Sequence, residues 1–70
     1  MKFVPVNSST IKEVGYDYDK HYLYVNFHGD REYVYADVPV DVYAKFLEAD
    51  SKGKYLHEAV VGKFNYTRMK

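Results

Sequence analysis

The chain has 70 residues, enough for one domain, and its ten basic and ten acidic residues give a formal net charge of zero. It has no cysteine, which excludes disulfide bonds, thiolate catalysis and zinc–thiolate sites. Hydrophobic residues make up 47% of the chain, which argues against disorder, and nine tyrosines and four phenylalanines supply most of the large ones. Because so short a chain has a small core, self-association as a homodimer or higher oligomer is one expected source of stability.

Charge is distributed unevenly along the chain. Residues 51–70 carry five basic residues against one acidic residue, a local charge of +4, whereas residues 1–50 have a local charge of −4. The C-terminal part therefore either forms a basic patch or has charges scattered over a solvated surface. The sequence has no long apolar run and no signal-peptide pattern, so we expect a cytoplasmic protein without a membrane partner.

The first predicted strand covers residues 11–16, after a polar stretch at residues 7–10 that is typical of a loop or a cap. The apolar residues of this strand do not alternate cleanly, which indicates a β-bulge or a short strand. Residues 17–21 have the composition of a turn.

Residues 22–27 form the clearest strand, because apolar and polar positions alternate. Its Leu23, Val25 and Phe27 are expected to face the core. A turn at residues 28–30, where Gly29 permits positive φ, leads to a third strand at residues 32–38, which ends at a proline. Three strands joined by short turns predict an antiparallel meander.

The period of the apolar residues changes to a helical one at residues 40–50. Ser51 is a good N-cap for a second helix, and Gly62 is a natural stop. Residues 63–70 form either a fourth, edge strand or a docked extension. We therefore predict a single α+β domain over residues 1–70, with an antiparallel three- or four-stranded sheet packed against two short helices, in the order β-β-β-α-α with or without a final strand.

Several short strings, in this order and at this spacing, are similar to the KTSC domain family. They are Ser8-Ser9-x-Ile11, Gly15-Tyr16-Asp17, Leu23-x-Val25-x-Phe27, Tyr33-Val34-Tyr35, Val38-Pro39, Ala49-x-Ser51-x-Gly53-x-Tyr55, Gly62-Lys63-Phe64, and the final Tyr66 and Arg68. The resemblance implies a domain found in small stand-alone bacterial or phage proteins and at the C-terminus of some lysyl-tRNA synthetases. It also implies a role in RNA binding. The resemblance gives no catalytic residues that could be assigned to positions of this chain.

Two pairs of tyrosines are candidate ligand-binding residues. Tyr33 and Tyr35 point to the same side of their strand, so they either stack on bases, if that side is open, or belong to the core, if it lies under the helices. Tyr22 and Tyr24 lie opposite the expected core face, where they form an aromatic strip. Such a strip serves an RNA-binding sheet, a dimer contact or simple cross-strand packing.

A second group of candidates is basic. At Ser51-Lys52-Gly53-Lys54, extending to Tyr55, a helix N-terminus with two lysines either binds phosphate or is a plain cap. Lys63 and Arg68 either extend a basic strip or pair with surface carboxylates.

Catalysis has little support in the sequence. The three histidines lack the close spacing of metal ligands, and Ser8 and Ser9 have no identifiable base partner. We expect no catalytic residue, no metal and no cofactor. The expected function is a non-catalytic binding module for RNA or a nucleotide. The alternative is a homo-oligomeric protein-interaction or inhibitor factor that blocks a protein partner or sequesters a small signalling nucleotide.

Overall fold

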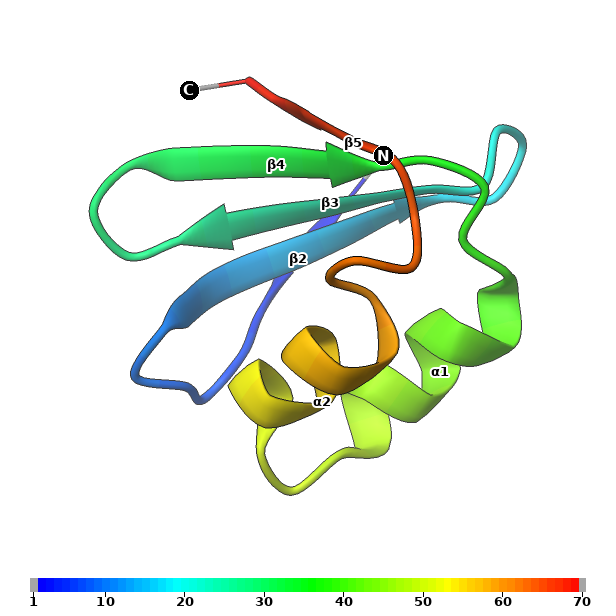
Figure 1. Cartoon of the computed structure of the whole chain (residues 1–70). Coiled ribbons are helices and arrows are strands. Elements are labelled where there is room, and N and C mark those ends of the chain that lie inside the picture. Colours follow the sequence, from blue (N-terminus) through cyan, green and yellow to red (C-terminus); the bar gives the residue numbers. More distant parts are fainter. Residues whose placement is uncertain (1, 70) are drawn as a thin grey trace.

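Alternation of apolar and polar residues organises one continuous antiparallel sheet in the computed structural model, which describes residues 2–69. Strands β1 to β4 form a meander, the two helices follow, and β5 returns to the outer edge of β4, so the strand order is β1-β2-β3-β4-β5 (Figure 1). The elements are β1 Phe3–Pro5, β2 Ile11–Asp17, β3 Tyr22–Phe27, β4 Arg31–Tyr35, α1 Val40–Glu48, α2 Lys52–Ala59 and β5 Tyr66–Arg68.

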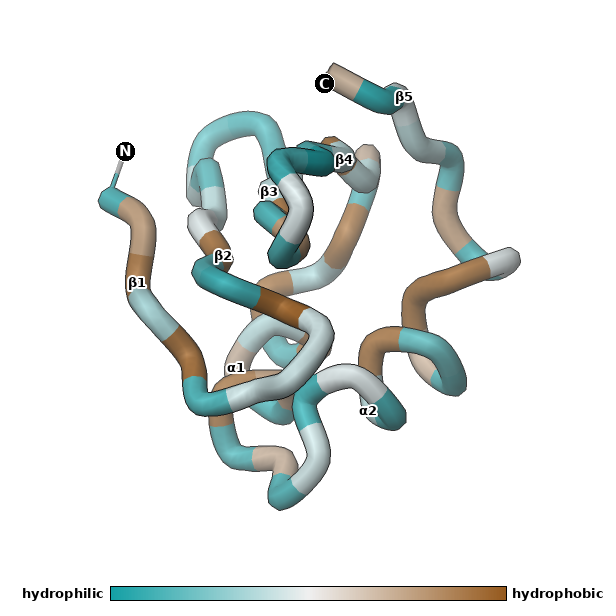
Figure 2. The backbone as a smooth tube through the Cα atoms, turned by 90° about the vertical axis from the view of Figure 1, so that its left-hand side faces the viewer, coloured by the Kyte–Doolittle hydropathy of each residue, from teal (hydrophilic) through white to brown (hydrophobic). Residues whose placement is uncertain are grey.

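Both helices lie on the same side of the sheet, so the domain has two layers and the other face of the sheet has no helix over it (Figure 2). The predicted α+β class and order of elements are confirmed, including the final strand. The sheet has five strands because β1, which was not predicted, pairs with β2. Neither helix in the described part of the chain is long and apolar enough to cross a bilayer.

The register of the central strands brings the apolar positions together. Leu23 is the cross-strand partner of both Tyr16 and Tyr35, and Val25 lies between Val14 and Tyr33 in the same way. The predicted irregularity in the first strand is a register shift between residues 11 and 13, which lets both Ile11 and Val14 face inward.

Local signals define the turns and helix ends. Gly29 has the expected positive φ, 92°. Ser51 is the N-cap of α2, since its Oγ accepts a hydrogen bond from the Lys54 amide at 3.3 Å. Strand β4 ends three residues earlier than predicted, because Asp37 adopts a φ of 57° that a strand does not allow. Helix α2 ends at Ala59, and Gly62, at φ 80°, belongs to the turn that follows.

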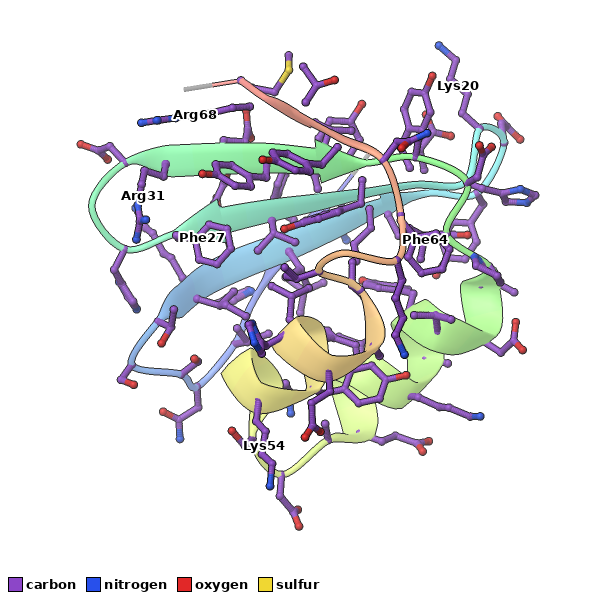
Figure 3. The ribbon with its side chains drawn as sticks, viewed as in Figure 1. Lys20, Phe27, Arg31, Lys54, Phe64 and Arg68 are labelled. Carbon is purple, nitrogen blue, oxygen red and sulfur yellow. The ribbon has the colours of Figure 1, made fainter. Side chains whose placement is uncertain are left out.

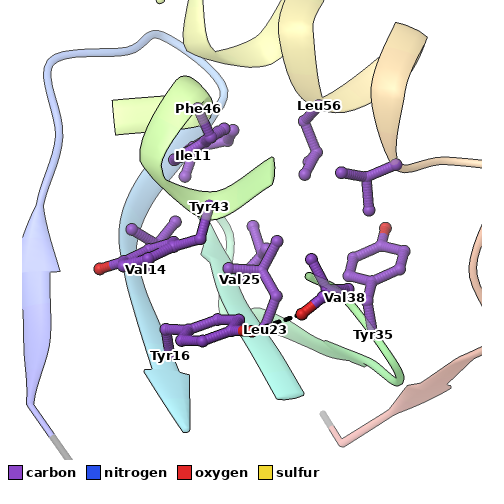
Figure 4. Close-up of a cluster of buried hydrophobic side chains, with 11 residues drawn as sticks. Ile11, Val14, Tyr16, Leu23, Val25, Tyr35, Val38, Tyr43, Phe46 and Leu56 are labelled. Atoms are coloured by element: carbon purple, nitrogen blue, oxygen red, sulfur yellow. Dashed lines mark hydrogen bonds between the residues drawn. The ribbon is translucent and has the colours of Figure 1, made fainter. Parts of the chain in front are cut away.

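The core lies between the sheet and the helices (Figure 4). Within it, the ring of Tyr16 stacks on that of Tyr43 with centroids 4.8 Å apart, and the Tyr16 hydroxyl donates a hydrogen bond to the carbonyl of Val38. Burial is the main cause that raises the pKa of Tyr16, Tyr35 and Tyr43. The main cluster of buried side chains is Ile11, Val14, Tyr16, Leu23, Val25, Tyr35, Val38, Tyr43, Phe46, Leu56 and Val60.

Candidate nucleic-acid interface

Aromatic and arginine side chains gather on the helix-side face of the sheet, toward the β3–β4 hairpin. Directly paired residues of an antiparallel sheet share a face. Phe27 pairs with Arg31, and Tyr33 pairs with Arg68. Tyr66 pairs with Tyr35, a core residue of β4. Figure 1 shows that the hairpin extends beyond the helices, and Figure 3 places Phe27, Arg31 and Arg68 toward this end. We call Phe27, Arg31, Tyr33, Tyr66 and Arg68 the aromatic–arginine surface.

The rings of this surface form a connected stack. Tyr33 and Tyr66 are nearly parallel, with an interplanar angle of 8° and centroids 5.3 Å apart. Phe27 meets Tyr33 edge to face at 5.5 Å. The guanidinium carbon of Arg31 lies 5.5 Å from the centroid of the Phe27 ring, within the range of a cation–π contact. Such contacts hold the rings and one cation in fixed positions before any ligand arrives.

Exposure decides which of these rings a ligand can reach. Tyr66 is 59% exposed, Phe27 and Tyr33 are half-buried, and both arginines are exposed. Tyr35 is only 2% exposed, so of the two interpretations for this residue the core one is correct and its proposed stacking on a ligand is not. Burial first, then Tyr33 and Tyr66, raise the pKa of Tyr35, as expected for a ring held among apolar groups.

Tyr22 and Tyr24 lie on the other face of the sheet, as the alternation of β3 predicts. The two rings are half-buried and 6.4 Å apart, and they line a hollow of about 260 Å³ with residues of β4 and the C-terminal segment. The sheet therefore separates these tyrosines from Tyr33 and Arg68, and the predicted ligand-binding residues do not form one continuous site.

The Ser51–Tyr55 segment belongs to a third region. Figure 3 places Lys54 in the helical layer, at the opposite side of the molecule from Arg68. Lys52 Nζ donates a hydrogen bond to the carbonyl of Ala49, and Tyr55 packs against the core at Phe46, with centroids 6.3 Å apart.

Gly53 does not lie at a close contact between the two helices. A Cβ added to Gly53 would lie 3.7 Å from Thr10, an ordinary contact with the β1–β2 loop. Ser51 acts as a helix cap, and nothing in this geometry brings the segment to the aromatic–arginine surface.

Lys63 is closer to that surface. It lines a hollow together with Gly62, Phe64, Asn65 and Tyr66, in the segment that leads into β5. Of the residues predicted from the sequence, Tyr33, Lys63 and Arg68 therefore lie on or beside the aromatic–arginine surface.

Comparison with known proteins places the chain in a family. The profile of the KTSC domain matches residues 7–64. This chain belongs to the KTSC domain family. The crystal structure of a KTSC domain protein from Yersinia pestis is similar over 99% of this chain and 97% of that one, with 33% identity and a TM-score of 0.94.

Two sequence relatives show the KTSC domain in different settings. A protein of Tsukamurella paurometabola is 37% identical over 60 residues, which are 86% of this chain and 90% of the relative. A lysine–tRNA ligase of Trichormus variabilis is 36% identical over 61 residues, which are 87% of this chain but only 11% of the ligase. A segment similar in sequence to this chain thus makes up nearly all of one protein and a small part of another.

Three members of the aromatic–arginine surface were not predicted as site residues: Phe27, Arg31 and Tyr66. Phe27 was expected to face the core, and it does lie on the helix side, but at the hairpin end. The signal for Tyr66 was its alternation with polar residues in the C-terminal tail. That signal could not indicate a site until the pairing of β5 with β4 was known.

Proposed function

We propose that this KTSC domain is a non-catalytic accessory module that binds single-stranded RNA through the aromatic–arginine surface. The observation that carries the proposal is the stack of Tyr33 on Tyr66. Tyr66 is 59% exposed, and Arg68 is the cross-strand partner of Tyr33. Exposed aromatic rings provide stacking platforms for unpaired bases, and nearby arginines bind phosphate.

The charge of the surface supports the same class of ligand. Arg31 and Arg68 come from neighbouring strands, and Lys63 precedes β5, so cations lie along the edge of the stack. For single strands, the logarithm of the affinity falls with the logarithm of the salt concentration by about 0.7 for each neutralised phosphate. Two to three contacts therefore predict a slope of about −1.4 to −2.1.

The name of one relative adds support. A lysine–tRNA ligase, whose name states that it acts on tRNA, contains a related segment as a small part of its length. An RNA-binding module beside such an enzyme is consistent with this arrangement. A free nucleotide would use the same stacking chemistry, so mononucleotides serve as competitors in the test.

Fluorescence anisotropy with a labelled single-stranded RNA of about 12 nucleotides and mixed sequence tests the proposal. Tyr66→Ala removes one stacking platform, and we expect affinity to fall about 5- to 150-fold, from roughly 1–3 kcal/mol per stacked base. Tyr18→Ala is the matched control, because Tyr18 is 64% exposed and lies at the β2–β3 turn. Equal losses in both variants, or binding independent of salt, would contradict the proposal. Competition by a mononucleotide at similar affinity would assign the site to nucleotides.

A further inference from the structure

The face of the sheet opposite the helices presents a second, chemically different surface, which we call the open face (Figure 2). Its members follow from the register, since partners in neighbouring strands share a face. By this alternation, the strand residues on the open face are Phe3, Pro5, Glu13, Gly15, Asp17, Tyr22, Tyr24, Asn26, Glu32, Val34 and Thr67.

The centre of the open face is aromatic and apolar. Gly15 is the cross-strand partner of both Phe3 and Tyr24, and the rings of these two residues meet edge to face at 6.0 Å. Tyr22 adds a third ring, 6.4 Å from Tyr24. Val34 is only 9% exposed although no helix covers it. Beside these residues lies the hollow of about 260 Å³, whose other lining residues are Ala36, Asn65, Tyr66, Thr67 and Met69.

Carboxylates flank this aromatic centre at both ends of β3. Asp17 is the partner of Tyr22 at one end, and Glu13 and Glu32 are the two partners of Asn26 at the other end. Glu13 accepts a hydrogen bond from the Asn26 side-chain amide at 2.7 Å.

Cations lie at the ends of the face. Lys12 is at the β2 irregularity, where it and Arg31 line a second hollow together with Glu13, Glu32 and Asp30. Lys20 is in the β2–β3 turn. Among residues 2–69, the lining of the hollow beside Tyr22 and Tyr24 contains no lysine or arginine.

The arrangement of aromatic rings and carboxylates on the open face favours one kind of binding partner over others. Nucleic acid is disfavoured, because the charged strand residues of the open face itself are the three carboxylates, which repel phosphate, whereas Lys12 and Lys20 lie at the irregularity and the turn beyond them. Two-fold pairing with a second copy is also disfavoured, since it places the same set of carboxylates on both sides of the interface. A positively charged partner is favoured, because tyrosine faces attract arginine and lysine, and the flanking carboxylates complement their charge.

We propose that the open face docks an extended basic segment of a partner protein, in which arginine or lysine alternates with apolar residues. The apolar side chains fill the hollow beside Tyr22 and Tyr24, and the cations reach the carboxylates at the two ends of β3. The open face and the aromatic–arginine surface meet at Tyr66, which also lines the hollow. Tyr22, Tyr24 and the three carboxylates belong to the open face alone, so substitutions at these residues test this proposal separately.

The test is an amide NMR titration of the whole chain with a synthetic peptide of alternating arginine and leucine, capped at both ends. We expect shifts at open-face residues of β3 and β4, and no binding of the same peptide with glutamate in place of arginine. Glu32→Gln keeps the side-chain shape and should weaken binding about 2- to 5-fold, as expected for one exposed charge pair. Glu58→Gln, on the exposed side of α2, is the matched control and should have no effect.

Tyr22→Ala tests the aromatic part, with an expected loss of about 5-fold or more. Urea unfolding of this variant shows whether its fold is intact, and RNA binding should be unchanged. Equal binding of both peptides, no binding of either, or shifts confined to the helices would overturn the proposal. Open-face shifts that depend on protein concentration alone would assign the face to a second copy, and shifts there with RNA would assign it to nucleic acid.

Discussion

Removing the hydroxyl of Tyr16 tests how the sheet is joined to the helical layer. This hydroxyl donates a hydrogen bond to the carbonyl of Val38, in the connection between β4 and α1 (Figure 4). Tyr16→Phe keeps the ring and its stack on Tyr43 but leaves a carbonyl of a fully buried residue without its donor. The substitution therefore isolates one buried polar contact between segments that are distant in sequence.

The expected cost follows from burial. Tyr16 is 4% exposed and Val38 is 0% exposed, so water does not readily replace the lost donor. An unsatisfied buried acceptor costs about 1–3 kcal/mol. A domain of this length has a total free energy of unfolding of roughly 3.5–10 kcal/mol, at about 0.05–0.15 kcal/mol per residue. The variant should thus lose a large fraction of its stability, and its Tm should fall by roughly 4–8 °C for each kcal/mol.

Urea unfolding followed by circular dichroism measures this loss. Tyr43→Phe is the matched control, because Tyr43 is the other ring of the same stack and its hydroxyl makes no hydrogen bond within residues 2–69. We expect the control to stay within about 0.5 kcal/mol of the wild type. If the free energy of unfolding of Tyr16→Phe is also within about 0.5 kcal/mol of the wild type, the hydrogen bond to Val38 does not stabilise the contact between the sheet and the helical layer.

Two further predictions concern pH and backbone conformation. Burial is the main cause that raises the pKa of Tyr16, Tyr35 and Tyr43 above 10.0 in the folded state. Below pH 10 all three phenols are protonated in both the folded and the unfolded chain, so the free energy of unfolding keeps their full stabilising contribution. Above pH 10 the unfolded chain loses its phenolic protons first, so the free energy of unfolding should fall by up to about 1.4 kcal/mol per pH unit for each tyrosine, measured by urea unfolding at alkaline pH. Gly62→Ala should destabilise the fold by about 1–2 kcal/mol, because Gly62 has a φ of 80°. Gly53→Ala should stabilise it by up to about 1 kcal/mol, since Gly53 lies in α2 and an added Cβ has room beside Thr10. Thermal melts of both variants check the opposite signs.

Much of the fold could be predicted because its signals are local. The alternation in β3, the turn at Gly29 and the cap at Ser51 each depend on a few neighbouring residues, and the structure confirms all three. Strand β1 could not be predicted in this way. It has three residues, including Pro5, and it forms only because β2 provides a partner.

The candidate site depended on information that is not local. The sequence indicates that Tyr33 and Tyr35 share a face, but only the position of the helices shows that Tyr35 is core and Tyr33 is half-buried. The sequence also indicates that Tyr66 and Arg68 would share one face of a strand in the tail. Their approach to Tyr33 depends on the pairing of residues 66–68 with residues 33–35. Contacts between segments so distant in sequence are set by tertiary packing, which periodicity does not encode.

The short strand β5 has a consequence for measured affinities. It has three exposed residues, it is joined to the sheet only through β4, and it carries two members of the aromatic–arginine surface. Short edge segments with few buried contacts open at a lower free energy than the whole domain. A ligand that needs Tyr66 and Arg68 therefore binds only the fraction of molecules in which β5 is docked, and its apparent Kd is the intrinsic Kd divided by that fraction. Binding should slow hydrogen exchange of the β5 amides, and substitutions that loosen the β4–β5 pairing should weaken binding without touching the ligand.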